Sequence, residues 1–110
     1  MYVLYVQALL YSLTKKPTYE TKVKNYMTYW NGLAGSGPCG IAWHSKWGVL
    51  RYAANTALIA LTAATEGIDT DANTEFAKGQ LDRMLGKCEG KSFVIGFGDN
   101  FPKKPHHRAA

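Results

Sequence analysis

The stretch SKWGVLRYAANTALIALTAATE, residues 45–66, decides the fold class because its apolar residues recur at helical spacing. Six alanines lie between positions 53 and 64, so the expected helix can approach its neighbours closely and be covered on most sides. Gly67 is well placed to end this helix, because glycine adopts the left-handed conformation of a helix C-terminus at little cost. The apolar stripe of this segment consists of Trp47, Leu50, Ala54, Ala57, Leu58, Leu61 and Ala64.

Two helices are expected before this segment. The break between them is Lys15-Lys16, and Pro17 favours the first position of the second helix. Two helices joined by so short a break are expected to pack side by side as an antiparallel hairpin. Helical spacing places Val3, Val6, Leu9, Leu10 and Leu13 on one face of residues 2–13, and repeats in Tyr19, Val23, Tyr26, Met27 and Trp30.

A loop and a fourth helix complete the expected architecture. Residues 31–41, NGLAGSGPCGI, contain four glycines and a proline and indicate a loop. The fourth helix is expected to begin near Asp71, which can cap it, and to end at Gly86. The sequence therefore predicts an all-α fold of two helical hairpins followed by a loop-rich C-terminal tail. The expected buried face of the fourth helix is Phe76, Leu81, Met84 and Leu85.

Composition narrows the class of protein. At 110 residues the chain is one small domain or a piece of a larger one. Its 46% apolar content is high for so small a body, which suggests that some apolar surface faces partner segments outside this chain. The net charge of +5 is divided between two small clusters and scattered residues, whereas nucleic-acid binding requires a dense basic stripe, so no nucleic-acid partner is expected.

The opening segment bears on membrane association, and the two cysteines bear on disulfide formation and metal binding. Residues 1–16 are apolar but too short to span a bilayer and lack the features of a signal peptide, so a buried helix and no membrane partner are expected. Cys39 and Cys88 could form a disulfide or remain two free thiols. Neither cysteine has a second Cys or His at metal-ligand spacing, so no metal site is expected.

Two groups of residues have the chemistry of sugar binding. Trp47 and Arg51 are four residues apart, so they would share a helical face, where an indole could cover a pyranose ring while the guanidinium donates to hydroxyls. The alternative is a helix terminus whose aromatic residue packs inward. In the closing HHR, His106 and Arg108 would point to the same side of an extended segment and suit an oxygen-rich ligand or a carboxylate; the alternative is a solvated basic tail.

Three motifs carry a resemblance to a known family. They are WGVLRYAANTALIAL (47–61), FAKGQLDRMLG (76–86) and SFVIGFGDNFPKKPHHR (92–108). In this order and at this spacing they resemble the C-terminal third of glycoside hydrolase family 9, the endoglucanases of the cellulase E type. The resemblance runs over nearly the whole chain, and Ile95 is a mild departure from the family pattern.

The resemblance implies a fold, an activity and a location. The family fold is an (α/α)6 barrel, of which two hairpins would form about a third. Family members are secreted enzymes that hydrolyse internal β-1,4-glucosidic bonds of cellulose with inversion, using an aspartate to activate water and a glutamate to protonate the leaving oxygen. The implied partner is a β-1,4-glucan, the full-length form would be a monomer, and no cofactor is implied.

The resemblance also assigns roles to individual residues. His106 would be the active-site histidine, with Arg108 as its partner at the sugar. Trp47 would stack on a sugar ring on the other side of the scissile bond, with Arg51 and Tyr52 as nearby cleft residues. This favours sugar binding over inward packing for Trp47.

Neither of the family's two catalytic carboxylates is matched in the chain. Residues 1–110 are therefore expected to be a partial catalytic domain that carries substrate-cleft residues and does not hydrolyse cellulose alone. Two alternatives remain: a non-catalytic carbohydrate-binding remnant, and a small helical interaction module.

Overall fold

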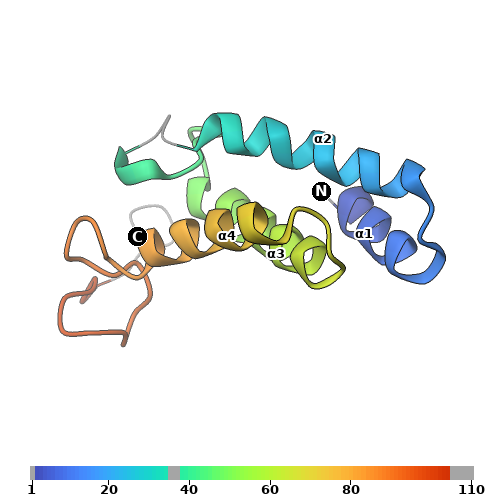
Figure 1. The fold of residues 1–110 in the computed structure, drawn as a ribbon. Coiled ribbons are helices and arrows are strands. Elements are labelled where there is room, and N and C mark those ends of the chain that lie inside the picture. Colours follow the sequence, from blue (N-terminus) through green and yellow to red (C-terminus); the bar gives the residue numbers. More distant parts are fainter. Residues whose placement is uncertain (1, 35–37, 105–110) are drawn as a thin grey trace.

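The computed structural model describes residues 2–34 and 38–104, and these residues form helices and loops without a strand. Figure 1 shows the helices as two antiparallel hairpins, α1 with α2 and α3 with α4. The all-α fold class is therefore confirmed. In chain order the elements are α1 (Tyr2–Thr14), α2 (Pro17–Leu33), the 3-10 helix η1 (Pro38–Gly40), α3 (Val49–Thr65) and α4 (Thr70–Met84).

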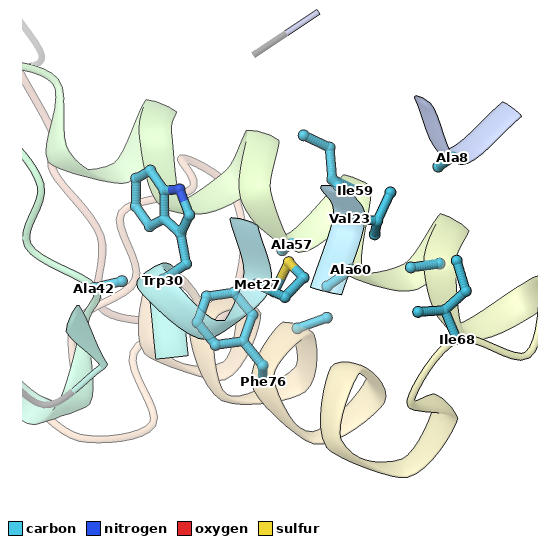
Figure 2. Packing of buried hydrophobic residues seen from close by; sticks show 12 residues of the cluster. Ala8, Val23, Met27, Trp30, Ala42, Ala57, Ile59, Ala60, Ile68 and Phe76 are labelled. Carbon is cyan, nitrogen blue, oxygen red and sulfur yellow. The ribbon is translucent and has the colours of Figure 1, made fainter. Parts of the chain in front are cut away.

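The main core lies where α2 meets the second hairpin. Val23, Met27 and Trp30 repeat at helical spacing along α2 and are all buried. They belong to one cluster with Ala60 of α3 and Phe76 of α4 (Figure 2). Burial of these apolar side chains is the main source of stability for the arrangement of the three helices.

Helix α3 buries most of its alanines together with Ile59, and exposes two of its leucines. Ala57, Ala60 and Ala63 are almost completely buried, whereas Leu58 and Leu61 are 55% and 39% exposed. The expected stripe was therefore wrong in including these two leucines. Small side chains let the backbones of packed helices come close together, so the alanine face of α3 packs inward and the leucine positions point outward.

Helix α3 begins four residues later than the sequence pattern predicted. Gly48 precedes Val49 in the left-handed conformation, with φ of 66°, and such a residue interrupts helical geometry. Trp47 therefore lies outside the helix. The expectation that Trp47 and Arg51 share a helical face was wrong, although both lie at the same end of α3.

The predicted C-terminal stop of α3 is confirmed. Gly67 has φ of 83° and its N–H donates to the carbonyl of Ala64 at 3.0 Å. The next N–H, of Ile68, donates to the carbonyl of Ala63 at 2.9 Å. This pair of bonds is the Schellman motif, and the buried Ile68 side chain supplies its apolar contact.

Helix α4 differs from the prediction at its start and on its inner face. The helix begins at Thr70 with Asp69 as the N-terminal cap residue in left-handed geometry, so Asp71 lies in the first turn and is not the cap. Leu81 and Leu85 are 40% and 37% exposed, so their expected burial was wrong. Polar side chains occupy part of the inner face instead. Asn73 and Gln80 donate to backbone carbonyls of the neighbouring segments, and Arg83 donates to the Glu89 carboxylate. The inner face consists of Asn73, Phe76, Ala77, Gln80, Arg83 and Met84.

Helix α1 has an exposed apolar face. Val3, Val6, Leu9 and Leu13 are 64%, 48%, 42% and 83% exposed, so the expectation of a buried helix was wrong for this face. Ala8 is fully buried and belongs to the main core. Among the described residues, no helix combines the length and the apolar character that crossing a membrane requires.

A disulfide and a set of loop contacts hold the C-terminal part together. Cys39 and Cys88 form a disulfide with a Cα–Cα distance of 5.9 Å, which joins η1 to the turn after α4 and answers the question that the sequence left open. Beyond α4 the described chain forms turns and bends up to residue 104, as the loop-rich tail predicted. The N–H of Phe93 donates to the carbonyl of Met84 at 2.8 Å, so the tail begins by folding back on α4.

Candidate functional site

The segment between η1 and α3 is held in place at its beginning. Ile41 and Ala42 are buried. The side-chain amide of Gln80, itself only 3% exposed, accepts from the N–H of Ala42 at 2.9 Å and donates to the carbonyl of Gly40 at 3.1 Å. A buried amide that satisfies both neighbouring backbone groups fixes the chain path leading to the candidate site.

Arg51 and Tyr52 belong to the candidate site and lie in contact on the first turn of α3. The Arg51 guanidinium donates from Nη2 to the Tyr52 hydroxyl at 3.1 Å, and its carbon lies 4.8 Å from the centre of the Tyr52 ring. Both contacts are attractive, and the second is a cation–π contact. The arginine head is thus held over the tyrosine, and a guanidinium presents its N–H donors in a planar fork.

Gly48 permits this position of Arg51. A Cβ atom at Gly48 would lie 3.2 Å from Nη2 and 3.3 Å from Nε of Arg51, so the arginine side chain passes over the glycine at close range. The same glycine has φ of 66°, which a residue with a side chain rarely adopts. The glycine before α3 therefore serves both the backbone turn and the packing of the arginine.

Trp47 presents its indole to solvent immediately before this turn. Its side chain is 71% exposed, so it does not pack inward, and its backbone N–H donates to Oγ of Ser45 at 3.4 Å. The Arg51 guanidinium passes over Gly48, the next residue in the chain, so the indole and the cation lie at the same end of α3. An exposed aromatic surface together with a planar cation can receive a sugar ring, whose C–H faces are apolar and whose rim carries hydroxyls.

His44 belongs to the same region, and sequence reasoning missed it. Its ring centre lies 5.1 Å from that of Trp30 and 5.3 Å from that of Tyr52, and its Nδ1 is 3.2 Å from the hydroxyl of Tyr29. The sequence offered one signal, a histidine between Trp43 and Trp47 in a short segment before a helix. Spacing alone does not show that α2 packs against that segment.

The remaining candidates from the sequence are the C-terminal histidine and arginine, metal ligands and the carboxylates of α4. His106 and Arg108 lie outside the described residues, so their position relative to Trp47 stays a prediction. Within the described ranges, no group of three or more His, Cys, Asp or Glu side chains is arranged to hold a metal ion. Lys78 donates to Asp82 at 2.6 Å and holds the pKa of that carboxyl below its ordinary value of 3.8, so Asp82 is an ion-pair partner on the surface of α4.

Two shallow hollows lie elsewhere on the surface. One, of about 320 Å³, lies between the end of α2, η1 and α4, and the other, of about 390 Å³, lies beside the disulfide. Neither hollow is lined by Trp47, Arg51 or Tyr52. The platform formed by Trp47, Arg51 and Tyr52 at the start of α3 therefore borders neither of these two hollows.

A family model and individual relatives both relate this chain to endoglucanases. The family model described as glycosyl hydrolase family 9 matches residues 1–110. The protein named Endoglucanase of Dictyostelium discoideum is 41% identical over 98 residues, covering 84% of this chain and 13% of that protein. Endoglucanase A of Bacillus pumilus is 38% identical over 117 aligned positions, covering 94% of this chain and 18% of that protein.

A solved structure of similar fold is also known. The structure of an endoglucanase from the termite Nasutitermes takasagoensis superposes with a TM-score of 0.87 at 43% sequence identity, covering 96% of this chain and 24% of that one. The chain thus spans less than a fifth of the length of these two curated relatives and about a quarter of the termite structure.

Proposed function

The chain belongs to glycosyl hydrolase family 9, and from that premise we propose that it supplies part of the substrate cleft of an endo-β-1,4-glucanase that acts on cellulose. The observation that carries this proposal is the platform at the start of α3. It combines the exposed indole of Trp47 with the guanidinium of Arg51, which is held on Tyr52. The relatives that match most of this chain are named endoglucanases.

The platform suits a glucose unit of a β-1,4-glucan. In such a chain the ring hydroxyls are equatorial and both ring faces are apolar, so the Trp47 indole can cover a face while Arg51 donates to the hydroxyls at the rim. Because Arg51 is already held on Tyr52, less side-chain freedom is lost when the sugar binds. Trp47, Arg51 and Tyr52 therefore act as substrate-binding residues.

The chemical step of the proposed reaction requires two carboxylates. In inverting hydrolysis a base activates water while an acid protonates the leaving oxygen on the other face of the sugar. We infer that both carboxylates are supplied by parts of a family 9 domain outside residues 1–110. His106 and Arg108 would contact the sugar beside the scissile bond and hold it in position for this step.

The proposed enzyme is secreted and monomeric in its full-length form and uses no cofactor. The disulfide between Cys39 and Cys88 supports secretion, since such bonds form and persist mainly in oxidising compartments.

The test is titration of cellotetraose into the purified 110-residue chain. We expect saturable binding that weakens by about tenfold or more in Trp47→Ala, since losing about 1.4 kcal/mol of stacking corresponds to that factor. Leu58→Ala, which removes another exposed side chain from the middle of α3, away from the platform, is the matched control and should bind like the unmodified chain. Absence of binding by the folded chain would contradict the proposal.

A hydrolysis assay tests the assignment of the two carboxylates. The purified chain should release no reducing sugar from carboxymethylcellulose, because removal of the acid and base lowers such rates by several orders of magnitude. Appreciable turnover that persists after repeated purification would show that the chain contains its own catalytic carboxylates.

A second candidate is a non-catalytic carbohydrate-binding unit. The observation in its favour is that the platform, the main core and the disulfide all lie within this one chain. It predicts the same binding of cellotetraose. It differs in a mixing experiment, where adding the remaining segments of a family 9 domain would produce no hydrolysis.

A further inference from the structure

His44 makes more aromatic contacts than its exposed position in a loop would require. Its ring centre lies 5.1 Å from that of Trp30, with an interplanar angle of 38°, and 5.3 Å from that of Tyr52 in an edge-on arrangement at 69°. A third ring, of Tyr29, lies edge-on at 6.1 Å, and its hydroxyl is 3.2 Å from Nδ1 of His44. One imidazole thus contacts three aromatic rings.

These contacts join elements that are far apart in the sequence. Tyr29 and Trp30 lie near the C-terminal end of α2, whereas Tyr52 lies on the first turn of α3. His44 lies between them, in the segment that connects η1 to α3, and its ring contacts both helices. Each aromatic pair of this geometry is attractive beyond simple burial of area.

The contacts continue to the sugar platform. Tyr52, against which His44 packs, accepts a hydrogen bond from Arg51 at 3.1 Å and carries the guanidinium over its ring at 4.8 Å. A continuous series of contacts therefore runs from α2 through His44 and Tyr52 to Arg51. In the proposed site, Trp47 covers the face of the sugar ring and Arg51 binds its hydroxyls.

We propose that His44 is a positioning residue for sugar binding: it packs Tyr52 against α2 and so fixes the direction of the Arg51 guanidinium toward glucose units of a β-1,4-glucan. This inference rests on the proposed function and adds a residue to the same site. His44 does not touch the sugar. It acts through Tyr52.

The physical reason is the cost of ordering a long side chain. An arginine on an exposed first turn has many rotamers, and binding a sugar through it requires one of them. The Tyr52 ring and hydroxyl select that rotamer before the sugar arrives. If Tyr52 loses the ring on its other side, its own position broadens, and the ordering of Arg51 must then occur at the binding step.

The experiment compares three variants of the 110-residue chain. His44→Ala removes the ring and its hydrogen bond, and is expected to weaken cellotetraose binding by about tenfold, the factor that corresponds to about 1.4 kcal/mol. Tyr29→Phe removes only the hydroxyl contact with Nδ1 and should weaken binding by about threefold. Tyr19→Phe also removes a hydroxyl from α2, one that has no hydrogen bond to another described residue, and is the matched control that should bind normally.

A second measurement separates positioning from general loss of structure. The side-chain Nε–H signal of Arg51, observed by NMR without sugar, should be sharp and shifted in the unmodified chain and should move toward the random-coil position in His44→Ala. Tyr19→Phe should leave it in place. Circular dichroism should show that the helix content of all three variants is unchanged.

The outcomes distinguish the two proposals. If the unmodified chain does not bind cellotetraose, the proposed function fails, and the Arg51 signal alone decides whether His44 orders the arginine. If the unmodified chain binds and His44→Ala binds equally well, the inference about His44 is overturned while the proposed function stands. An Arg51 signal that is identical in His44→Ala and in the unmodified chain overturns the inference in either case.

Discussion

Helices α3 and α1 are both apolar, yet one is covered by its own chain and the other is not. On α3 the alanines at positions 57, 60 and 63 are almost completely buried against neighbouring helices. On α1 the larger side chains Val3, Val6 and Leu13 are at least 48% exposed, although they repeat at helical spacing. The same helical spacing of apolar residues is therefore buried in α3 and exposed in α1.

The difference shows what periodicity does and does not determine. Periodic apolar residues define a face, but burial depends on whether another segment is available to cover it. The small residues of α3 let α4 approach closely within this chain. The face of α1 has no such cover among the described residues, which agrees with a chain that spans 24% of the termite endoglucanase structure.

The largest expected effect comes from the disulfide, which reinforces the second hairpin and not α1. Replacing both Cys39 and Cys88 by serine should lower the free energy of unfolding by about 4 kcal/mol, because the bond closes a loop across a separation of 49 residues. Urea unfolding followed by circular dichroism measures this. Addition of a reductant should affect the unmodified chain by a similar amount and leave the serine variant unchanged.

The next effect concerns the turn that ends α4. A Cβ atom at Gly86 would lie 2.7 Å from the backbone carbon of Lys91, and its φ is 95°. Gly86→Ala should therefore destabilise the chain by about 3 kcal/mol, from backbone strain together with the steric clash. The matched control is Gly67→Ala, where φ is 83° but no atom lies within 4 Å of the added carbon, and about 1 kcal/mol is expected. Equal losses in the two variants would show that the close approach to Lys91 is unimportant.

Changes on the two helix faces should differ in size. Ala60→Val adds volume to a position of α3 with no exposed surface and should cost about 2 kcal/mol of stability by overpacking. Leu13→Ser on α1, where the side chain is 83% exposed, should change stability by less than about 0.5 kcal/mol. Thermal unfolding gives both values. A large loss in Leu13→Ser would mean that α1 is covered in solution, for instance by a second copy, and sedimentation would then reveal the oligomer.

The smallest expected effect is a pH dependence on the outer surface of α4. The hydrogen bond from Lys78 lowers the pKa of Asp82 below 3.8 in the folded state. The resulting stabilisation is present above the unfolded pKa and disappears as the pH falls through the lower folded value. Because the pair is exposed, the effect on the melting temperature should be slight. It should decrease further in Lys78→Met, and an unchanged acid profile in that variant would contradict the role of this pair.

Local signals explain what the sequence predicted correctly. Helix α2 begins at Pro17, and α3 and α4 end just before Gly67 and Gly86. These boundaries depend on the backbone conformations that proline and glycine favour, which are set within a few residues. The late start of α3 was missed because Gly48 takes a left-handed conformation that the apolar pattern does not reveal. The exposure of Leu81 depends on how α4 is rotated, which Gln80 helps to fix by binding the distant segment around Ala42.

For the candidate site too, the sequence identified some residues but not their arrangement. Trp47, Arg51 and Tyr52 were identified from chemistry and resemblance, and the structure places them at one end of α3. Their geometry could not be predicted, because it depends on Gly48 and on contacts across long separations in sequence. His44 was missed for that reason, since its partners on α2 are found only when the helices are packed.

The central claim is that the exposed indole before α3 receives a glucose unit, and the indole N–H signals of the chain's three tryptophans test it most directly. During a titration with cellotetraose, the account predicts that the Nε1–H signal of Trp47 shifts progressively and reaches saturation, while that of the buried Trp30 moves little. A Trp47 signal that stays in place while the sugar binds elsewhere would contradict the account.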